Sequence, residues 1–223
     1  MSNKKKLLRY ADLGKYKNVF EPDFVNSSDP FSLKGFWAER HFENTNPITL
    51  ELACGKGDYT VKLAALNPDR NFIGIDIKGD RLWHGASQVE RMNLINTAFL
   101  RIDINYLRSY FAESEIEEIW ITFPDPQRKS KQQKKRLTNP RYLEIYREIL
   151  VAYGKVHLKT DDEGLFEYTL ATVSSEGCEL MEEIRDIYAK AELRKELKIK
   201  TYYEDKYLQD NRPIHYLSFQ FPS

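Results

Sequence analysis

Three acidic residues stand inside or at the ends of short apolar segments that alternate with helical ones. Glu51 lies inside the first segment, Asp76 ends the second, and Asp103 ends the third. A carboxylate at the end of a parallel strand can accept two hydrogen bonds from a ribose diol, and another can accept from an adenine amino group. The spacing therefore predicts a site for a cofactor that carries a nucleoside.

A glycine-containing turn follows Glu51. Gly55 and Gly57 permit a tight turn and a close backbone approach to a ligand. The phosphate-binding pattern GxxxxGK[ST] is absent, and Thr60 stands where a dinucleotide fingerprint has its third glycine. An acid-rich mouth instead suits a cationic donor without phosphate, such as S-adenosylmethionine. The alternative is that Glu51 caps a loop amide and that the two aspartates are helix N-caps.

A fourth acid, Asp125, stands between Pro124 and Pro126 at the end of another apolar segment. Two prolines fix the backbone around this carboxylate and are expected to aim it into the crevice where ligands bind. The run RKSKQQKKR at 128–136 follows directly, with six basic residues and no acid. A polyanion bound there would lie beside the cofactor, although a solvated loop is the alternative interpretation.

The charge balance supports a local basic patch. The chain has 34 basic and 34 acidic residues. Six basic residues lie in 128–136, and Lys4, Lys5, Lys6 and Arg9 add four more. Without these ten, 24 basic residues face 34 acidic ones. Positive charge concentrated on an acidic body is typical of a polyanion-binding surface.

The pattern of the chain predicts a parallel α/β sheet. Strands are expected at 48–55, 71–77, 97–103, 117–125 and 155–161. Helices are expected at 58–67, 79–96, 104–111, 139–154, 163–175 and 178–193. Two final strands, 198–207 and 213–221, have no helix between them and are expected to be antiparallel. Ligands of such sheets bind beyond the carboxyl ends of the strands.

Composition and organisation exclude several classes. Residues 1–47 read as a loosely organised extension with one helix near 31–43, and 48–223 as the main domain. No apolar run of about 18 residues exists and the N-terminus lacks a secretory pattern, so a cytoplasmic chain without a membrane span is expected. Two cysteines and four histidines without metal spacing predict no metal site, and His157 is expected in the core.

These motifs resemble the bacterial tRNA (guanine-N7-)-methyltransferase family. The matching pieces are ELACGKGDYT, FIGIDIKGDRL, ITFPDPQRKSKQQKKRLTNPRYL, LKTDDEGLFEYTL and TYYEDKY, which together span most of 48–207. The FPDP element followed by basic residues and Arg-Leu-Thr is the most specific of them. The resemblance implies a Rossmann-like class I methyltransferase fold, with a mostly parallel seven-stranded sheet, helices on both faces and an antiparallel C-terminal strand.

The resemblance also implies roles for individual residues. Contacts with S-adenosylmethionine would come from Glu51, Gly55, Gly57, Asp76, Asp103 and Asp125, with Asp125 also catalytic. The substrate nucleotide would be bound by Lys129, Asp161, Thr201 and Glu204, and RNA would be contacted by Lys131, Lys134, Lys135 and Arg136. Two positions depart from the family: Ala53 replaces the first loop glycine, which should not close the turn, and Gln127 replaces a frequent tryptophan.

The chemistry favours N7 of guanine as the acceptor. This nitrogen carries a lone pair, so placement of the reactants matters more than a strong base. Asp161 and Glu204 could accept from guanine N1–H and its exocyclic amine, which adenine cannot offer. The alternatives are that Asp161 caps the helix expected near Glu163 and that Glu204 is a solvated charge at a strand end.

The expected function is methyl transfer to a guanine of the tRNA variable loop, with tRNA as partner and a monomer or homodimer as the assembly. Three other functions remain open. A nicotinamide-dependent oxidoreductase could use a similar sheet, and a non-catalytic RNA-binding module could keep the fold. A methyltransferase could also act on another RNA position, or on a small molecule or a protein; the last two substrates would leave 128–136 without a task.

Overall fold

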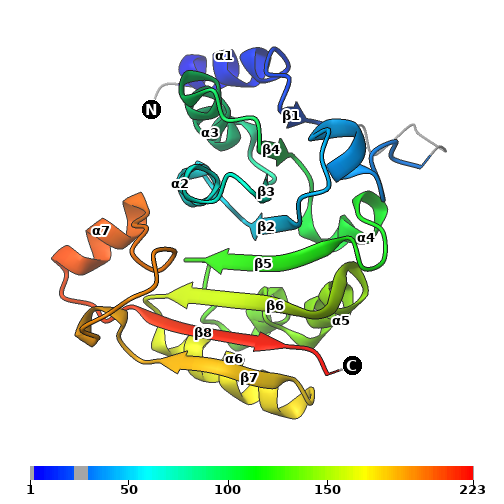
Figure 1. Cartoon of the computed structure of the whole chain (residues 1–223). Helices are drawn as coiled ribbons and strands as arrows, with labels where there is room; N and C mark the ends of the chain where they lie inside the picture. Colours follow the sequence, from blue (N-terminus) through cyan, green and yellow to red (C-terminus); the bar gives the residue numbers. More distant parts are fainter. Residues whose placement is uncertain (1–2, 23–29, 223) are drawn as a thin grey trace. The chain divides into compact units, whose positions relative to one another are not determined.

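A computed structural model describes residues 3–22 and 30–222 of the 223-residue chain. The side chains of Lys4 and Lys5, expected in a basic tail, lie outside the described part. The chain divides into two compact units, Met1–Ala112 and Glu113–Ser223. The fold is α/β, as the sequence predicted, and each unit contributes strands and helices (Figure 1).

The first unit is a parallel sheet with helices packed on it. Its strands lie in the order β1-β4-β3-β2. Their bounds are β1 Val19–Phe20, β2 Ile48–Leu52, β3 Asn71–Ile75 and β4 Thr97–Leu100. The helical elements are α1 Asn3–Leu13, η1 Trp37–His41, α2 Asp58–Leu66, α3 Gly79–Met92, η2 Ile104–Tyr106 and α4 Leu107–Tyr110. Strands β2 and β3 are buried along their whole length, which explains their continuous apolar sequence.

The described residues of the N-terminal region form more regular structure than the sequence predicted. Helix α1 packs against α3, with Leu13 buried in a cluster that also contains Leu82 and Phe99. Strand β1 pairs in parallel with β4 and extends the sheet. The helix expected near 31–43 is only the short π-helical segment η1, in which Trp37 is buried and donates to the Tyr110 carbonyl at 3.0 Å. Contacts between aromatic side chains stabilise this region, and such contacts leave no helical periodicity in the sequence.

The second unit combines one parallel and two antiparallel strand pairs. Strand order is β5-β6-β8-β7, with β5 parallel to β6 and with β8 antiparallel to both neighbours. The strands are β5 Ile116–Thr122, β6 Leu150–Thr160, β7 Glu179–Ile184 and β8 His215–Gln220. The helical elements are η3 Ser130–Lys135, α5 Pro140–Ile149, α6 Glu163–Ser175, η4 Ile187–Ala189 and α7 Tyr202–Gln209. Helix α6 packs against β6, β7 and β8.

Two elements of this unit differ from the prediction. The expected helix 178–193 is strand β7, which pairs with β8 after Gly177 turns the chain at φ 64. The expected strand 198–207 contains helix α7 instead. Strand pairing at the sheet edge overrides the helix-favouring composition of ELMEEI. The helix has a local cause, because Thr201 and Glu204 form a capping box.

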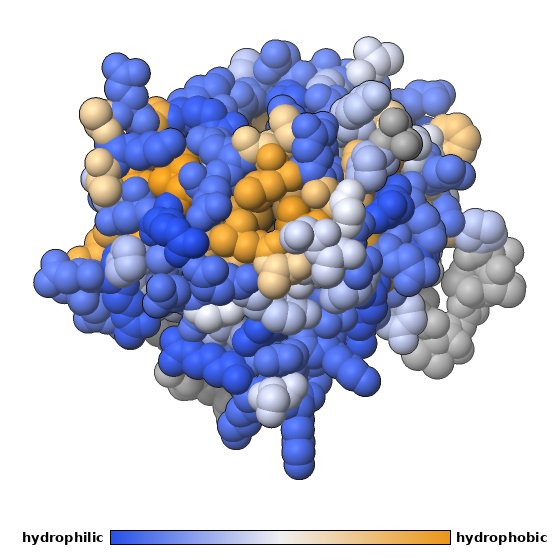
Figure 2. Space-filling view, turned by 90° about the horizontal axis from the view of Figure 1, so that it is seen from below, coloured by the Kyte–Doolittle hydropathy of each residue, from blue (hydrophilic) through white to orange (hydrophobic). Residues whose placement is uncertain are grey.

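The surface agrees with the composition. Figure 2 shows one face covered mainly by hydrophilic residues, with apolar residues gathered in limited patches.

Within residues 3–22 and 30–222, no helix is both long and apolar enough to cross a membrane. The same residues contain no group of three or more side chains that could hold a metal ion.

Candidate active site

The turn after β2 takes its shape from three left-handed residues. Ala53, Gly55 and Gly57 have φ values of 55, 58 and 72°. The Cys54 amide donates to the Ile75 carbonyl at 2.9 Å, and the Gly57 amide donates to the Cys54 carbonyl at 2.9 Å. Alanine at position 53 therefore accepts the strained conformation and the turn forms, as expected for this departure from the family.

Close packing under the turn requires glycine. A Cβ at Gly57 would lie 2.6 Å from the Phe99 ring, and one at Gly85 would lie 2.4 Å from it. The ring thus brings the start of α2 and the middle of α3 against β4. At Gly55, by contrast, an added Cβ would meet nothing within 4 Å. The outer side of the turn therefore has room for a ligand.

Glu51 holds the beginning of α2. Its side chain is buried, and Oε2 accepts from both the amide and the hydroxyl of Thr60. Gly57, the N-cap of that helix, offers no side-chain cap, so the Glu51 carboxylate takes this role. The structure thus realises the capping alternative for Glu51, and its contact with a cofactor stays a prediction.

Asp76 fixes the junction between two strand ends. Its Oδ2 accepts from the Gly55 amide at 2.9 Å, and its Oδ1 accepts from the Lys78 amide at 2.8 Å. The carboxylate is 6% exposed. It does not cap α3, whose N-cap Lys78 makes no side-chain cap. Two backbone donors instead orient a carboxylate at the carboxyl end of β3, beside the glycine turn.

Asp103 is the N-cap of η2. Its Oδ1 accepts from the Asn105 amide at 2.9 Å and from the Asn105 side chain at 2.6 Å, while Oδ2 takes part in neither bond. Because β2, β3 and β4 are neighbours, the unit brings Glu51, Asp76 and Asp103 to one edge of its sheet. An acidic edge beside an open glycine turn fits a cationic, phosphate-free nucleoside cofactor such as S-adenosylmethionine.

The FPDP turn of the second unit is held in a strained shape. Phe123 and Gln127 both have φ near 48°. The Phe123 amide donates to the Lys159 carbonyl at 2.8 Å, and the Gln127 amide donates to Asp125 Oδ1 at 3.1 Å. Strain of this kind persists where surrounding contacts determine the backbone, and it is enriched at functional sites. The turn leaves the Asp125 side chain exposed.

The basic run contains two kinds of residue. The predicted RNA contacts Lys131, Lys134 and Lys135 are exposed on η3, as is the predicted substrate contact Lys129 before it. Arg136 differs: it is buried, donates through Nε to the Pro126 carbonyl at 3.0 Å, and lies over the Tyr168 ring at 4.4 Å. Its contact with RNA stays a prediction, while the structure gives its side chain an anchoring role.

The first arginine of the run also has a protein partner. Arg128 Nε lies 2.8 Å from Asp162 Oδ2. Asp162, and not Asp161, is the N-cap of α6, because its Oδ1 accepts from the Leu165 amide at 2.8 Å. Asp161 instead pairs with Arg212 at 3.0 Å. The capping alternative for Asp161 is therefore wrong, and its predicted contact with guanine stays a prediction.

The predicted substrate segment begins helix α7, which lies beyond the carboxyl ends of β5 and β6 (Figure 1). Thr201 is its N-cap, and its hydroxyl accepts from the Glu204 amide at 3.1 Å. Glu204 is fully buried, so the interpretation of this residue as a solvated charge is wrong. Its carboxylate lies 2.7 Å from Lys159 Nζ. The T-x-x-E capping signature was visible in the sequence and could have found the helix.

A thiol nucleophile is not available next to the glycine turn. Burial raises the pKa of Cys54 well above its ordinary value, and the charges of Glu51 and Asp76 raise that pKa further. The group therefore stays a neutral thiol at physiological pH. Covalent cysteine catalysis is not the chemistry of this turn.

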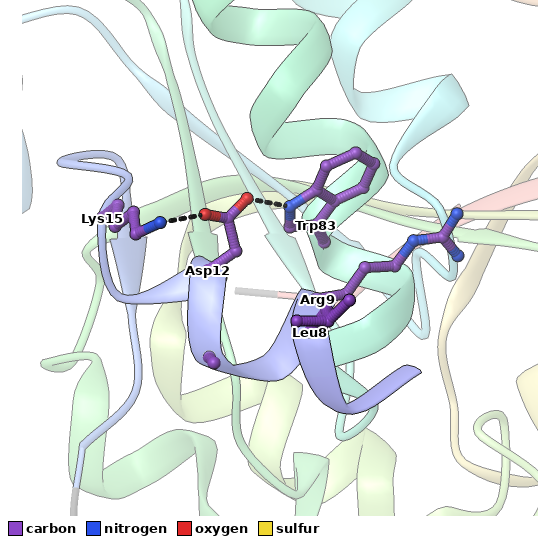
Figure 3. A pocket seen from close by; sticks show the side chains of 6 residues that line it. Leu8, Arg9, Asp12, Lys15 and Trp83 are labelled. Atoms are coloured by element: carbon purple, nitrogen blue, oxygen red, sulfur yellow. Dashed lines mark hydrogen bonds and ion pairs between the residues drawn. The ribbon is translucent and has the colours of Figure 1, made fainter. Parts of the chain in front are cut away.

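A separate surface pocket lies between α1 and α3 (Figure 3). It has a volume of about 450 Å³ and is lined by Leu8, Arg9, Ala11, Asp12, Lys15 and Trp83. Asp12 accepts from the indole of Trp83 and pairs with Lys15, both at 2.7 Å. None of the predicted site residues lines this pocket.

Comparison with known proteins defines the family. A family model described as "Putative methyltransferase" matches residues 45–217. A tRNA (guanine-N(7)-)-methyltransferase from Christiangramia forsetii is 47% identical and aligns over 99% of both chains. The 16S rRNA methyltransferase KamB superposes with a TM-score of 0.65 at 13% identity, covering 89% of this chain and 97% of that one.

A second solved structure shares the fold. It is a variant 16S rRNA methyltransferase with the cosubstrate SAM, and it superposes with a TM-score of 0.57 at 11% identity, covering 89% of this chain and 93% of that one. At such low identity these two structures establish the class I methyltransferase fold alone. The near-full-length sequence match is more specific, and the chain belongs to the tRNA (guanine-N7-)-methyltransferase family.

Proposed function

We propose that this protein transfers a methyl group from S-adenosylmethionine to N7 of a guanine in the variable loop of tRNA, giving 7-methylguanosine. The observation that carries the proposal is the 47% identity, over nearly the whole chain, to a protein named tRNA (guanine-N(7)-)-methyltransferase. The acidic strand ends and the exposed basic loop support it. A tRNA substrate implies a cytoplasmic protein. Residues 48–223 would form the catalytic domain, and 1–47 would be an extension whose α1 and β1 pack on it.

The first unit would hold the cofactor. S-adenosylmethionine supplies an electrophilic methyl group on a cationic sulfur. Asp76, fixed by two amides, is suited to accept hydrogen bonds from a ribose diol. Asp103 has an oxygen outside its own cap, and Gly55 leaves room for close approach. Glu51 supports this arrangement by fixing α2 behind the turn.

The second unit would hold the nucleotide that is methylated. The N7 lone pair is free at neutral pH, so no residue has to remove a proton before attack. Asp125, exposed at the rigid FPDP turn, would act by positioning the reactants and by stabilising charge. Lys129, Asp161 and Thr201 would contact the nucleotide. Lys131, Lys134 and Lys135 would bind phosphates, which gives affinity but reads no sequence.

The decisive experiment uses labelled S-adenosylmethionine and unmodified tRNA. We expect label in the tRNA, and chain scission at one variable-loop position after reduction and aniline treatment, which reveals 7-methylguanosine. Label without scission would keep the methyltransferase and contradict N7. No label in tRNA, with label entering another RNA or a small molecule, would contradict the proposed substrate.

A further inference from the structure

A fully buried lysine stands at the end of β6. Lys159 has no exposed surface, yet its ammonium group is fully hydrogen-bonded. Nζ donates to the carbonyls of Leu197 and Ile199 at 3.1 and 2.9 Å, and to Glu204 Oε2 at 2.8 Å. The ammonium group thus has two backbone carbonyls and the Glu204 carboxylate as its acceptors. Burying a charge is costly unless it is paired, so removing one member of this group of contacts would leave an uncompensated buried charge.

The carboxylate of Glu204 is engaged at both oxygens. Oε1 lies 2.7 Å from Lys159 Nζ and accepts from the Tyr188 hydroxyl at 2.8 Å. Oε2 accepts from Lys159 and, at 3.4 Å, from the Thr201 amide. A guanine could bind this buried carboxylate only by displacing one of these partners. Glu204 therefore differs from the exposed side chains of its segment, because its hydrogen bonds are made inside the protein.

The same lysine reaches the FPDP turn. Its carbonyl accepts from the Phe123 amide at 2.8 Å, and its Nζ lies 5.9 Å from the centre of the Phe123 ring. That ring packs at 5.8 Å from Tyr207 of α7. Phe123 precedes Asp125 by two residues and has a left-handed backbone. Lys159 therefore contacts both the turn that carries Asp125 and the segment that begins α7.

We infer that Lys159 and Glu204 are positioning residues, which lock the segment 197–204 against the FPDP turn, and that Glu204 does not contact the guanine. This inference rests on the proposed function. Tight coupling of the two segments fixes the distance between Asp125 and the residues that bind the nucleotide. A displacement of about 1 Å at such a site can lower the rate about a hundredfold.

The test compares tRNA carrying guanosine at the target position with tRNA carrying inosine there. Inosine keeps N7 but lacks the exocyclic amine. We expect Lys159→Met and Glu204→Gln to lower kcat on both substrates by roughly 10- to 100-fold. The ratio of kcat/KM between guanosine and inosine should stay within about twofold of the wild-type ratio, and KM for S-adenosylmethionine should be unchanged. Lys155→Met, at an exposed lysine of the same strand, is the matched control.

Specific outcomes overturn the inference. A ratio that falls toward one in Glu204→Gln would show that Glu204 reads the amine. If Lys159→Met had a normal kcat and Glu204→Gln were inactive, the two residues would not act as a pair. If these variants do not fold, Tyr188→Phe removes one hydrogen bond to Glu204 and should lower kcat severalfold at an unchanged ratio; unchanged kcat would contradict the network.

The test also separates this inference from the proposed function. Failure of the wild type to form 7-methylguanosine would contradict the proposed function before any variant is compared. If the wild-type enzyme had equal kcat/KM for guanosine and inosine, the proposed site would not recognise the exocyclic amine. The inference would then be decided by whether Lys159→Met and Glu204→Gln lower kcat equally.

Discussion

The aspartates of the predicted site differ in how far their carboxylates are already engaged. Both oxygens of Asp76 accept from backbone amides. Asp103 and Asp125 each use Oδ1 to close a local turn. Asp76 is buried, whereas Asp125 is exposed. Substitution should therefore loosen the glycine turn at Asp76, whereas at Asp125 it should disturb one local hydrogen bond of the FPDP turn.

At Asp125, we expect the asparagine variant to lose at least about 100-fold in kcat, because it removes the charge that we propose to act beside the reacting atoms. The exposed side chain makes one local hydrogen bond, so the melting temperature should change little. Radiolabel transfer and thermal melting are the measurements. Asp69→Asn, at another exposed aspartate, is the control. Turnover near that of the wild type would remove Asp125 from the mechanism.

At Asp76, the asparagine variant should raise KM for S-adenosylmethionine about 10- to 100-fold. Hydrogen bonds to a charged group contribute about 1.5–3 kcal/mol, and about 1.4 kcal/mol corresponds to a factor of ten. The amide also presents a donor to a backbone donor, which loosens the turn. Steady-state kinetics at saturating tRNA measures this effect. An unchanged KM would contradict the assignment of Asp76 to the cofactor.

At the scale of elements, helix α6 anchors both ends of the basic loop. Asp162 at its N-terminus pairs with Arg128, and Tyr168 lies under Arg136. Tyr168 also accepts at 2.8 Å from Asn139, which caps α5. The exposed lysines between these anchors are therefore presented by a fixed loop. The two arginines of the loop contact other parts of the protein, whereas the lysines are exposed to solvent.

This division predicts different salt dependences of tRNA binding. Replacing Lys134 and Lys135 together by alanine should reduce the slope of log K against log salt by roughly 1.4–1.8, the value for two lost phosphate contacts. Arg136→Met should leave the slope unchanged while lowering stability and activity. Filter binding over a range of salt concentrations measures both. A slope reduced by Arg136→Met would show that this side chain contacts phosphate.

Elements were predictable where their cause is local. The apolar runs of β2 and β3 and the helical spacing of α2 and α3 identified the parallel part of the sheet. Strand β7 was missed because its six residues include three glutamates and gain strand structure only by pairing with β8. Edge strands commonly carry such charges.

At the scale of the molecule, each unit has its own core. In the second unit, His157 is 1% exposed and stacks on Trp120 with ring centres 4.1 Å apart. Its Nδ1 lies 2.9 Å from the Tyr216 hydroxyl. Burial lowers the pKa of His157, and Glu118 opposes that effect only in part. The sequence predicted this core histidine correctly.

The lowered pKa makes stability depend on pH. The folded state keeps His157 neutral, while the unfolded chain binds a proton below its ordinary pKa of about 6.5. Stability from this residue is therefore present above pH 6.5 and is lost as pH falls toward the folded pKa. We expect melting temperature to fall between pH 7 and 5, by roughly 2–4 °C per kcal/mol lost.

His157→Phe provides the comparison for this pH dependence. The variant keeps a ring between Trp120 and Tyr216 but cannot titrate, so its melting temperature should fall less steeply over the same pH range. It should be less stable at pH 7, because the Tyr216 hydroxyl loses one of its partners, although it keeps Arg194. Parallel curves for the two proteins would contradict the role of His157.

The sequence by itself determined the α/β class, the family and the acids at the strand ends, because these depend on local periodicity and on motifs of fixed spacing. Only the tertiary structure decided which of those side chains are already engaged. Glu51 caps α2, and Lys159 balances the charge of Glu204. Arg136 is buried and donates to a carbonyl of the turn that precedes the basic run. The partners belong to different elements of the chain: 45 residues separate Lys159 from Glu204, and 9 separate Glu51 from Thr60. Such pairs form only when the strands and helices pack.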